Sequence, residues 1–346
     1  MNTSFVLTIA VPTFNMEQWL DKNLATYCDK RLFDRLEVIC LNNASEDSSK
    51  QIIERYMLEY PRIFRLIDRD SRGYGASINQ ALVEAKGRYF RIVDADDWVD
   101  TRELIRFVDA LESCNEDVVL TDYQIINMQN GKMTPVLARD QGIAYHVTME
   151  SFAGPLKTLP SIHNTSYRTD LLRSSGFCMQ DKIFFVDEEY VILPYLYAKS
   201  VIYYTFDVYR YQVANPAQST SPKNRAKYQE HREQVLRRLI SSYYEAKQGG
   251  TGQNALDYCF ERIKRGVGDH FTTLYMYVEC RCEGRRLAAR WKAYLLAEAP
   301  EYGQAVQQKV RYLAILNRFH IGLKQYEKLK RIVANASDAS QKRSHG

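Results

Sequence analysis

The stretch Tyr89–Trp98 constrains the fold more than any other part of the sequence, because a short apolar run ends abruptly in three carboxylates. The run Tyr-Phe-Arg-Ile-Val predicts a buried strand, and Asp94, Asp96 and Asp97 follow it directly. Carboxylates are costly to bury unless a cation or hydrogen bonds compensate them. Ligands of open α/β sheets bind beyond the carboxyl ends of strands, so the motif indicates a site for a divalent metal and a nucleotide diphosphate. The alternative is a solvated turn or helix cap.

Further apolar runs of strand length alternate with helical patterns over the first two thirds of the chain. Polar groups follow the first two runs, at Pro12–Asn15 and at Asn42–Asp47. This alternation predicts a doubly wound, mostly parallel sheet. The predicted strands are 5–11, 36–41, 64–67, 89–93, 117–122, 201–206 and 209–212, and the predicted helices are 19–27, 48–60, 76–85, 101–114, 169–174 and 187–197. The polar segment 125–160, rich in glycine and proline, predicts irregular loops rather than part of the core.

The 346 residues are too many for one small domain. We expect a large α/β domain at 1–222, a helical domain at 223–336 and a flexible tail at 337–346. The predicted helices of the second domain are 228–248, 255–279, 287–297 and 302–333, with a break near Gly322. Their basic, amphipathic character leaves three roles open: a packed subdomain, a homo-oligomer interface, and peripheral contact with an anionic membrane. Packing or oligomerisation is favoured.

The cysteines and the chain start bear on the cellular compartment. The seven cysteines are scattered, and Cys280-Arg-Cys282 lacks the spacing of a zinc knuckle, so we expect free thiols. The chain shows no signal-peptide pattern and no run of 18 apolar residues. These features predict a cytoplasmic location, with the inner face of the membrane as the alternative. The net charge of +5 is mild, and we expect no nucleic-acid partner.

Residues 5 to about 222 resemble a family 2 glycosyltransferase with the GT-A fold, of the type that builds bacterial polysaccharides and glycans. Four ordered motifs carry the resemblance: Val11–Asn15; Asn42–Asp47; Gly75, Asn79, Gly87 and Asp94–Asp97; and Asp187–Tyr190 followed by Tyr209–Tyr211 and Gln218-Ser219. Each motif is weak alone, but their order and their positions at strand ends are specific.

The resemblance implies a donor site for a nucleotide sugar. Pro12 and Thr13 match the loop beside the base, and Asn43 matches a position where the family has an Asp that accepts the uracil N–H. An Asn carbonyl still accepts that bond, although the lost charge weakens the case for uridine. Asp94 and Asp96 match the acids that hold Mn²⁺ or Mg²⁺, and Asp97 matches a neighbour of the donor sugar. The other donor-site candidates are Asn15, Arg72, Asn79, Ala95 and Ser219.

The resemblance also implies a catalytic base. Asp187 matches the acid that takes the acceptor's proton in inverting members of the family, and Glu188 is the reserve candidate. The alternative for both is that they only begin a helix, where the dipole favours acids. His231 is a candidate metal ligand, and Arg210 and His163 are candidates for contacts near the donor phosphate or the acceptor; a solvated or structural position is the alternative for each.

Together these features predict a metal-dependent, inverting glycosyltransferase that uses a nucleoside-diphosphate sugar, with UDP favoured. The expected acceptor is a hydroxyl of a glycan, a lipid-linked oligosaccharide or a glycoprotein; the transferred sugar is a hexose or an N-acetylhexosamine. One alternative is a non-catalytic module that binds nucleotide sugars or acts as a scaffold, which Asn42-Asn43 favours. Another is a nucleotidyltransferase, although Pro12–Asn15 stands where that class has a glycine-rich, basic loop.

Overall fold

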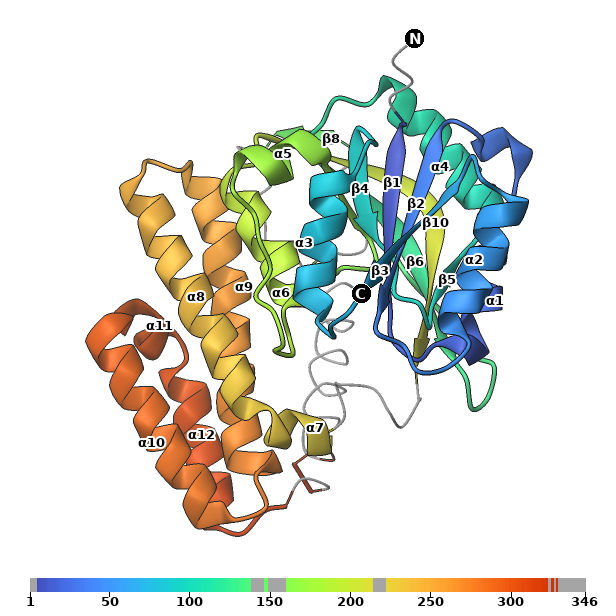
Figure 1. The fold of residues 1–346 in the computed structure, drawn as a ribbon. Coiled ribbons are helices and arrows are strands. Elements are labelled where there is room, and N and C mark those ends of the chain that lie inside the picture. Colours follow the sequence, from blue (N-terminus) through green and yellow to red (C-terminus); the bar gives the residue numbers. More distant parts are fainter. Residues whose placement is uncertain are drawn as a thin grey trace, which may run out of the picture. The chain divides into compact units, whose positions relative to one another are not determined.

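A ten-stranded sheet carries the first part of the chain (Figure 1). The computed structural model describes residues 5–137, 146–148, 160–213, 222–322, 325–326 and 328. The strand order is β3-β2-β1-β4-β9-β6-β10-β5, with β7 paired to β6 and β8 to β10. The strands are β1 Leu7–Thr13, β2 Leu36–Asn43, β3 Phe64–Arg69, β4 Tyr89–Ile92, β5 Trp98–Val99, β6 Val118–Asn127, β7 Met133–Val136, β8 His146–Thr148, β9 Thr165–Arg168 and β10 Ser200–Val213.

The chain divides into two compact units that do not coincide with a single cut in the sequence. The first unit is Met1–Gln218 with Ser241–Arg262, and the second is Ser219–Ile240 with Ile263–Gly346. Helices α8 (Gln229–Gln248) and α9 (Gln253–Thr272) therefore each contribute residues to both units. The domain boundary that we placed at residue 222 stays a prediction, and the tail 337–346 lies outside the described residues.

The N-terminal half of the sheet is parallel. β1 lies between β2 and β4, and β2 pairs with β3, all in parallel. Every residue of β1 and β2 is buried, because helices cover both faces of this half. This arrangement explains why these strands read as continuous apolar runs in the sequence. The α/β class with a doubly wound sheet is thereby confirmed.

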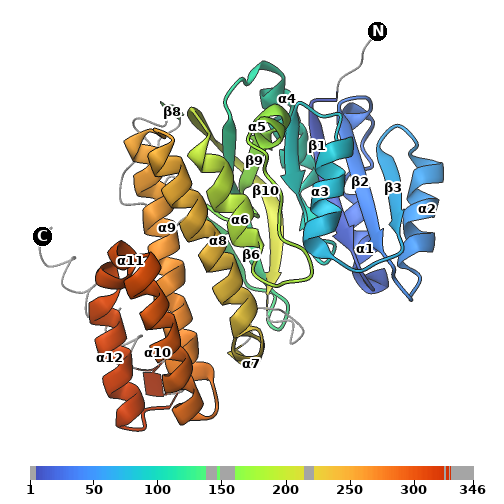
Figure 2. The same ribbon diagram turned by 60° about the vertical axis from the view of Figure 1, so that its left-hand side comes forward.

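The other half of the sheet is mixed. β9 runs antiparallel to both β4 and β6, and β5 runs antiparallel to β10, whereas β6 and β10 are parallel. The antiparallel β9 has a consequence for the site, because its first residues lie beside the carboxyl end of β4. Figure 2 shows β9, β6 and β10 side by side with the parallel strands beyond them.

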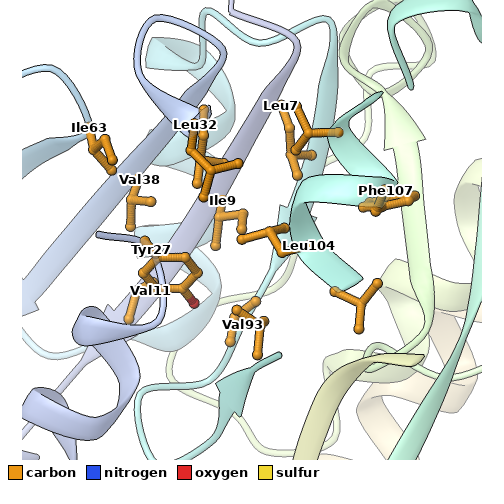
Figure 3. Close-up of a cluster of buried hydrophobic side chains, with 14 of the residues drawn as sticks. Leu7, Ile9, Val11, Tyr27, Leu32, Val38, Ile63, Val93, Leu104 and Phe107 are labelled. Atoms are coloured by element: carbon orange, nitrogen blue, oxygen red, sulfur yellow. The ribbon is translucent and has the colours of Figure 1, made fainter. Parts of the chain in front are cut away.

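A hydrophobic core lies between one face of the sheet and three helices (Figure 3). Leu7, Ile9 and Val11 of β1 point into it, since alternate residues of a strand face the same side. Side chains of α1 (Glu17–Ala25), α2 (Ser49–Glu59) and α4 (Thr101–Ser113) close this core. Helix α3 (Tyr74–Glu84) packs on β1 and β2 without joining that cluster and covers the opposite face. The remaining helices of the first unit that precede α8 are α5 Thr169–Ser174 and α6 Asp187–Ile192.

The segment predicted as irregular contains strands, and that prediction was wrong in part. β6 continues to Asn127 and forms a hairpin with β7, whose turn has Gly131 at φ 68°. β7 is an exposed edge strand, so it tolerates Pro135 and polar residues that read as loop in the sequence. Residues 146–148 form β8, and 138–145 and 149–159 lie outside the described residues.

The two strands predicted at 201–206 and 209–212 are one strand, β10. Its register with β6 shifts on either side of Asp207, where the sequence pattern breaks. A bulge inserts extra residues without ending the strand, so the interruption was misread as a connection.

The second unit is helical over its described residues. After α7 (Pro222–Lys227), α9 passes into a π-helical turn at Thr273–Tyr277. Helices α10 Arg281–Glu298, α11 Pro300–Ala305 and α12 Gln307–Arg318 follow. The predicted long helix from 302 is interrupted at Val306 and again at 319–322, where we predicted a break near Gly322, and residues 325–326 are helical. In the described part of the chain, no helix combines the length and apolar character that crossing a bilayer requires.

Candidate active site

The Asp94–Asp97 loop is held in place by an amide from the first helix. β4 ends at Ile92, and the loop turns back with the Asp97 N–H donating to the Asp94 carbonyl at 3.0 Å. Asn23 of α1 is fully buried and donates from Nδ2 to the carbonyls of Asp94 and Asp97, at 3.1 and 2.8 Å. One side-chain amide thus binds the backbone at both ends of the loop. These two hydrogen bonds restrict the loop backbone and so help to fix where its carboxylates lie.

Tyrosine hydroxyls orient these carboxylates. Tyr74, the first residue of α3, donates to Asp94 Oδ1 at 2.9 Å. Tyr209 of β10 donates to Asp97 Oδ2 at 2.6 Å and accepts from the Asp94 N–H at 3.2 Å. The Gln212 N–H donates to Asp97 Oδ1 at 2.8 Å. Hydrogen bonds therefore reach both oxygens of Asp97 and one of Asp94.

The electrostatics of the loop favour a bound cation. Burial and the neighbouring Asp96 raise the pKa of Asp94 to about 7, although the bond from Tyr74 acts in the other direction. Burial, followed by the charges of Asp96 and Asp94, raises the pKa of Asp97 well above its usual value. No ion pair reaches any of the three carboxylates from the residues that the structure describes. Among the described residues, none supplies a counter-ion to negative charge here, and a divalent cation would supply one.

One group of side chains in the described part of the chain has the proximity that a metal site requires. Ligand atoms of Asp94, Asp97 and His163 all lie within 4.8 Å of one another. His163 Nδ1 is buried, and none of the described residues offers it a hydrogen bond. An unpartnered imidazole nitrogen beside two carboxylates fits a divalent transition metal. We predicted Asp94, Asp96 and His231 as metal ligands; this group shares Asp94 with that set and has Asp97 and His163 in place of the other two.

Strand pairing brings His163 to the loop. β9 pairs antiparallel with β4, with Tyr167 opposite Phe90, and continuing this register places His163 opposite Asp94. The ring stacks on Tyr211 at 4.0 Å between centroids, and the buried Arg91 donates to its backbone carbonyl. Burial and the charge of Arg91 lower the pKa of His163 to about 3, so its imidazole is neutral and able to ligate.

The predicted base-binding residues gather at the ends of β1 and β2. Asn43 is 5% exposed; its Nδ2 donates to the Leu41 carbonyl at 3.3 Å, whereas its Oδ1 accepts no hydrogen bond from the described residues. Thr13 is fully buried, with Pro12 beside it in β1. Asn15 has φ 53° and accepts from the Glu46 N–H at 2.9 Å, which joins the two loops. A buried carbonyl oxygen with no partner is the group that a base N–H would satisfy.

Two other donor-site candidates have structural partners. Asn79 donates from Nδ2 to the Met179 carbonyl and accepts from the Met179 N–H, both at 2.8 Å. Its amide thus fastens the segment around Met179 to α3. Arg72 pairs with Glu46 and lies over the Phe14 ring at 4.2 Å, and its side chain is 59% exposed. Their contact with a diphosphate stays a prediction.

The structure brings Asp187 to the carboxylate loop. Asp187 begins α6, and its charge contributes to the raised pKa of Asp94, of Tyr74 and of Tyr211. Its side chain is exposed and Glu188 is half-buried. The adjacent Glu189 is fully buried and accepts two bonds from Gln180, at 2.8 and 2.6 Å, so it has a structural role.

Three further candidates are Ser219, His231 and Arg210. Ser219 lies outside the described residues. His231 lies on α8 in the second unit, and its role as a ligand stays a prediction. Arg210 pairs with Asp100 at 3.1 Å and with Asp207 at 2.9 Å, so it has structural partners, and its contact with a substrate stays a prediction.

Sequence reasoning missed Asn23 and Tyr74. Asn23 sits between Leu20 and Leu24 on the buried face of α1, and an amide in an apolar stripe is a signal for a buried hydrogen-bonding task. Tyr74 follows Gly73 at the start of α3 and carried no comparable signal.

Comparison with known proteins agrees with this geometry. Residues 8–176 match the family model described as glycosyl transferase family 2. A poly(ribitol-phosphate) beta-glucosyltransferase from Bacillus spizizenii is 30% identical over 124 residues, covering 35% of this chain and 19% of that protein. A putative glycosyltransferase, EpsH, from Bacillus subtilis is 23% identical over 221 residues, covering 60% of each. The chain spans between about a fifth and three fifths of the curated relatives it matches.

Solved structures share the fold. The chain matches residues 1–349 of TarS from Staphylococcus aureus with a TM-score of 0.57 at 17% identity, over 91% of both chains. The same protein in complex with UDP-GlcNAc matches with a TM-score of 0.56 at 16% identity, over 91% of this chain and 92% of that one. The matched family region contains Asn43 and the group formed by Asp94, Asp97 and His163. Residues 8–176 therefore match glycosyl transferase family 2, and the chain has the GT-A fold of these solved structures.

Proposed function

We propose that the chain is a metal-dependent, inverting glycosyltransferase that moves a sugar from a nucleoside-diphosphate sugar, with UDP favoured, to a hydroxyl of a glycan, a lipid-linked oligosaccharide or a glycoprotein. One observation carries the proposal: Asp187 and Asp94 lie 93 positions apart in the sequence and are near enough that one charge raises the pKa of the other. A metal-type carboxylate cluster and a separate exposed carboxylate thus share one site.

The case for a nucleotide rests on Asn43 and on the relatives. Asn43 Oδ1 is a buried acceptor that no described residue satisfies, at the end of a strand in the parallel half of the sheet. In open α/β sheets, nucleotides bind beyond the carboxyl ends of the strands. The structural neighbour TarS has been crystallised with UDP-GlcNAc and with UDP. An amide oxygen that accepts the uracil N–H would account for both the residue and its burial.

The metal would sit among Asp94, Asp97 and His163, with Asp96 beside them. A nitrogen ligand in this set favours Mn²⁺ over Mg²⁺, since Mg²⁺ prefers oxygen ligands alone. When bound, the ion would neutralise charge on the departing diphosphate. Tyr74 and Tyr209 hold the carboxylates in orientation through their hydroxyls.

The chemical step needs a proton acceptor, and we assign this role to Asp187. As the acceptor oxygen forms its bond to the anomeric carbon, the carboxylate of Asp187 takes the hydroxyl proton, and the bond from the anomeric carbon to the diphosphate breaks. The side chain is exposed at the start of α6 and is therefore accessible to an acceptor. Attack from the face opposite the leaving group inverts the configuration.

The test is a set of matched acid-to-amide substitutions. A thermal-shift panel of nucleotide sugars with Mn²⁺ first identifies the donor, because a ligand that binds only the native state raises its stability. With that donor and a panel of hydroxyl acceptors, Asp187→Asn should lower the rate of nucleotide release by about 10²–10⁴-fold, the usual share of a general base. Asp170→Asn is the control, because Asp170 is an exposed acid in the first turn of α5.

The outcomes separate the alternatives. If Asp187→Asn keeps its turnover and Glu188→Gln loses it, Glu188 rather than Asp187 is the base. A product with retained anomeric configuration, measured by NMR, rejects the inverting mechanism. Binding of a nucleotide sugar without turnover on any acceptor supports the non-catalytic module instead.

A further inference from the structure

The second unit contains a pair of exposed thiols that no part of the proposed reaction uses. Cys280 is the residue before α10 and Cys282 lies in its first turn, with the two Sγ atoms 2.8 Å apart. Both are exposed, and all seven cysteines of the chain are free thiols, as predicted. Of the other five, only Cys178 is exposed. Two thiols in direct contact at the surface form a dithiol.

The surroundings make the two thiols unequal. Hydrogen bonds from the Cys282 thiol and from the Glu283 N–H lower the pKa of Cys280, whereas the bond to Cys280 raises the pKa of Cys282. A thiolate at a helix N-terminus is the reactive form of cysteine. Cys280 is thus suited to attack an oxidant, and Cys282 is placed to resolve the product.

We propose that Cys280 and Cys282 form a reversible redox site, in which a peroxide converts the dithiol to an intramolecular disulfide. The Sγ separation of 2.8 Å is already well below an ordinary sulfur contact, and a disulfide needs about 2.05 Å. Both cysteines are exposed, so a dithiol reductant reaches the disulfide and reopens it.

The step balances in two stages. The Cys280 thiolate attacks one oxygen of the peroxide, so that an S–O bond forms, the O–O bond breaks and the second oxygen leaves as an alcohol or water. Cys282 then attacks the sulfur of this sulfenic acid; the S–S bond forms, and the sulfenic oxygen leaves as water with the thiol proton. Two thiols lose two hydrogens in total, and the peroxide is reduced.

The residue between the two cysteines links this site to the end of the last helix. Arg281 donates to the carbonyls of Asn317 and His320, at 3.1 and 2.9 Å, and so caps α12. On the other side, a Cβ at Gly284 would lie 2.2 Å from the Leu274 carbonyl, so the first turn of α10 is packed tightly. Closure of the disulfide must therefore be absorbed at Cys280–Arg281, and it weakens the cap on α12.

The sequence offers a direct assay for the disulfide. Trypsin cleaves after Arg281, between the two cysteines, and gives the peptides 266–281 and 282–285. After treatment of the reduced, full-length protein with hydrogen peroxide, blocking of the free thiols and digestion, the two peptides should appear as one disulfide-linked species that dithiothreitol separates. Thiols counted in denaturant should fall from seven to five.

Controls keep the result interpretable. Cys178→Ser should form the linked peptide as the wild type does, whereas Cys282→Ser should stop at the sulfenic acid of Cys280. Two results would overturn the proposal. One is that the wild type keeps all seven thiols under conditions that oxidise Cys280 in Cys282→Ser. The other is a disulfide to Cys178 or between two molecules in place of the Cys280–Cys282 disulfide. Hydrogen exchange of residues 313–322 should accelerate on oxidation of the wild type; unchanged exchange in the oxidised protein would overturn the link to α12.

Discussion

Removal of one hydroxyl, in Tyr209→Phe, tests whether the carboxylate loop is organised for a metal ion. The hydroxyl donates to Asp97 Oδ2 at 2.6 Å and accepts from the Asp94 N–H at 3.2 Å, and the ring is 1% exposed. Phenylalanine fills the same volume without the oxygen. The loss of a buried hydrogen bond to an acid lowers the free energy of unfolding by about 1–3 kcal/mol.

The same substitution has a second, separable effect. Groups that orient metal ligands are worth about 10–100-fold in metal affinity when they are removed. We therefore expect Tyr209→Phe to weaken Mn²⁺ binding by about 10–100-fold, measured by isothermal titration calorimetry on the folded protein. The stability loss is measured in parallel by urea unfolding without metal.

Tyr203→Phe is the matched control. Tyr203 lies on the same strand, is also 1% exposed, and donates to both oxygens of the buried Asp122 at 2.9 Å. It should lose about as much stability, about 1–3 kcal/mol, but keep the Mn²⁺ affinity of the wild type. Equal Mn²⁺ affinity in Tyr209→Phe and the wild type, or an equal loss in both variants, would refute the assignment of Tyr209 to the metal site.

Two further predictions concern packing and pH. A Cβ at Gly75 would lie 1.9 Å from the Gln180 carbonyl oxygen, so Gly75→Ala should lower the free energy of unfolding by about 1–3 kcal/mol. Gly252→Ala is the control, because a Cβ there would meet no atom of the described residues within 4 Å. Equal stability of the two variants in urea would contradict the close approach at Gly75. Burial and nearby arginines lower the pKa of His270 to about 3, so below pH 6.5 the unfolded chain binds a proton that the folded chain excludes. The free energy of unfolding therefore decreases as the pH is lowered, by at most about 1.4 kcal/mol per pH unit. His270→Leu should flatten this dependence between pH 7 and 5, and parallel curves for variant and wild type would show that His270 does not cause it.

The parallel half of the fold was predictable because its strands are buried on both sides. The first two strands lie with every residue buried, so each appears as an apolar run that ends in polar residues. The β6–β7 hairpin was not predictable in this way. β7 is exposed at the edge, and exposure removes the apolar pattern on which the prediction depends.

The same distinction applies to the site. Asp94, Asp97 and Asp187 were predictable because charged groups beside strands and helix starts stand out in a sequence. The contribution of His163 depends on the antiparallel pairing of β9 with β4, and that of Asn23 on packing of α1 beneath the loop. Contacts of this kind join residues about 70 positions apart, and no local pattern records them.

The fastening of the segment 179–181 to α3 limits which parts of the candidate site can move. Three hydrogen bonds join them: Asn79 donates to the Met179 carbonyl and accepts from the Met179 N–H, and the Ala76 N–H donates to Asp181 at 3.1 Å. Gln180 is bonded in turn to Glu189, so α3, this segment and α6 move as one body. Separating α3 from the segment would cost about 1.5–4.5 kcal/mol in hydrogen bonds alone. We therefore expect the candidate site to open through elements outside this body, with the distance between Tyr74 and Asp187 little changed.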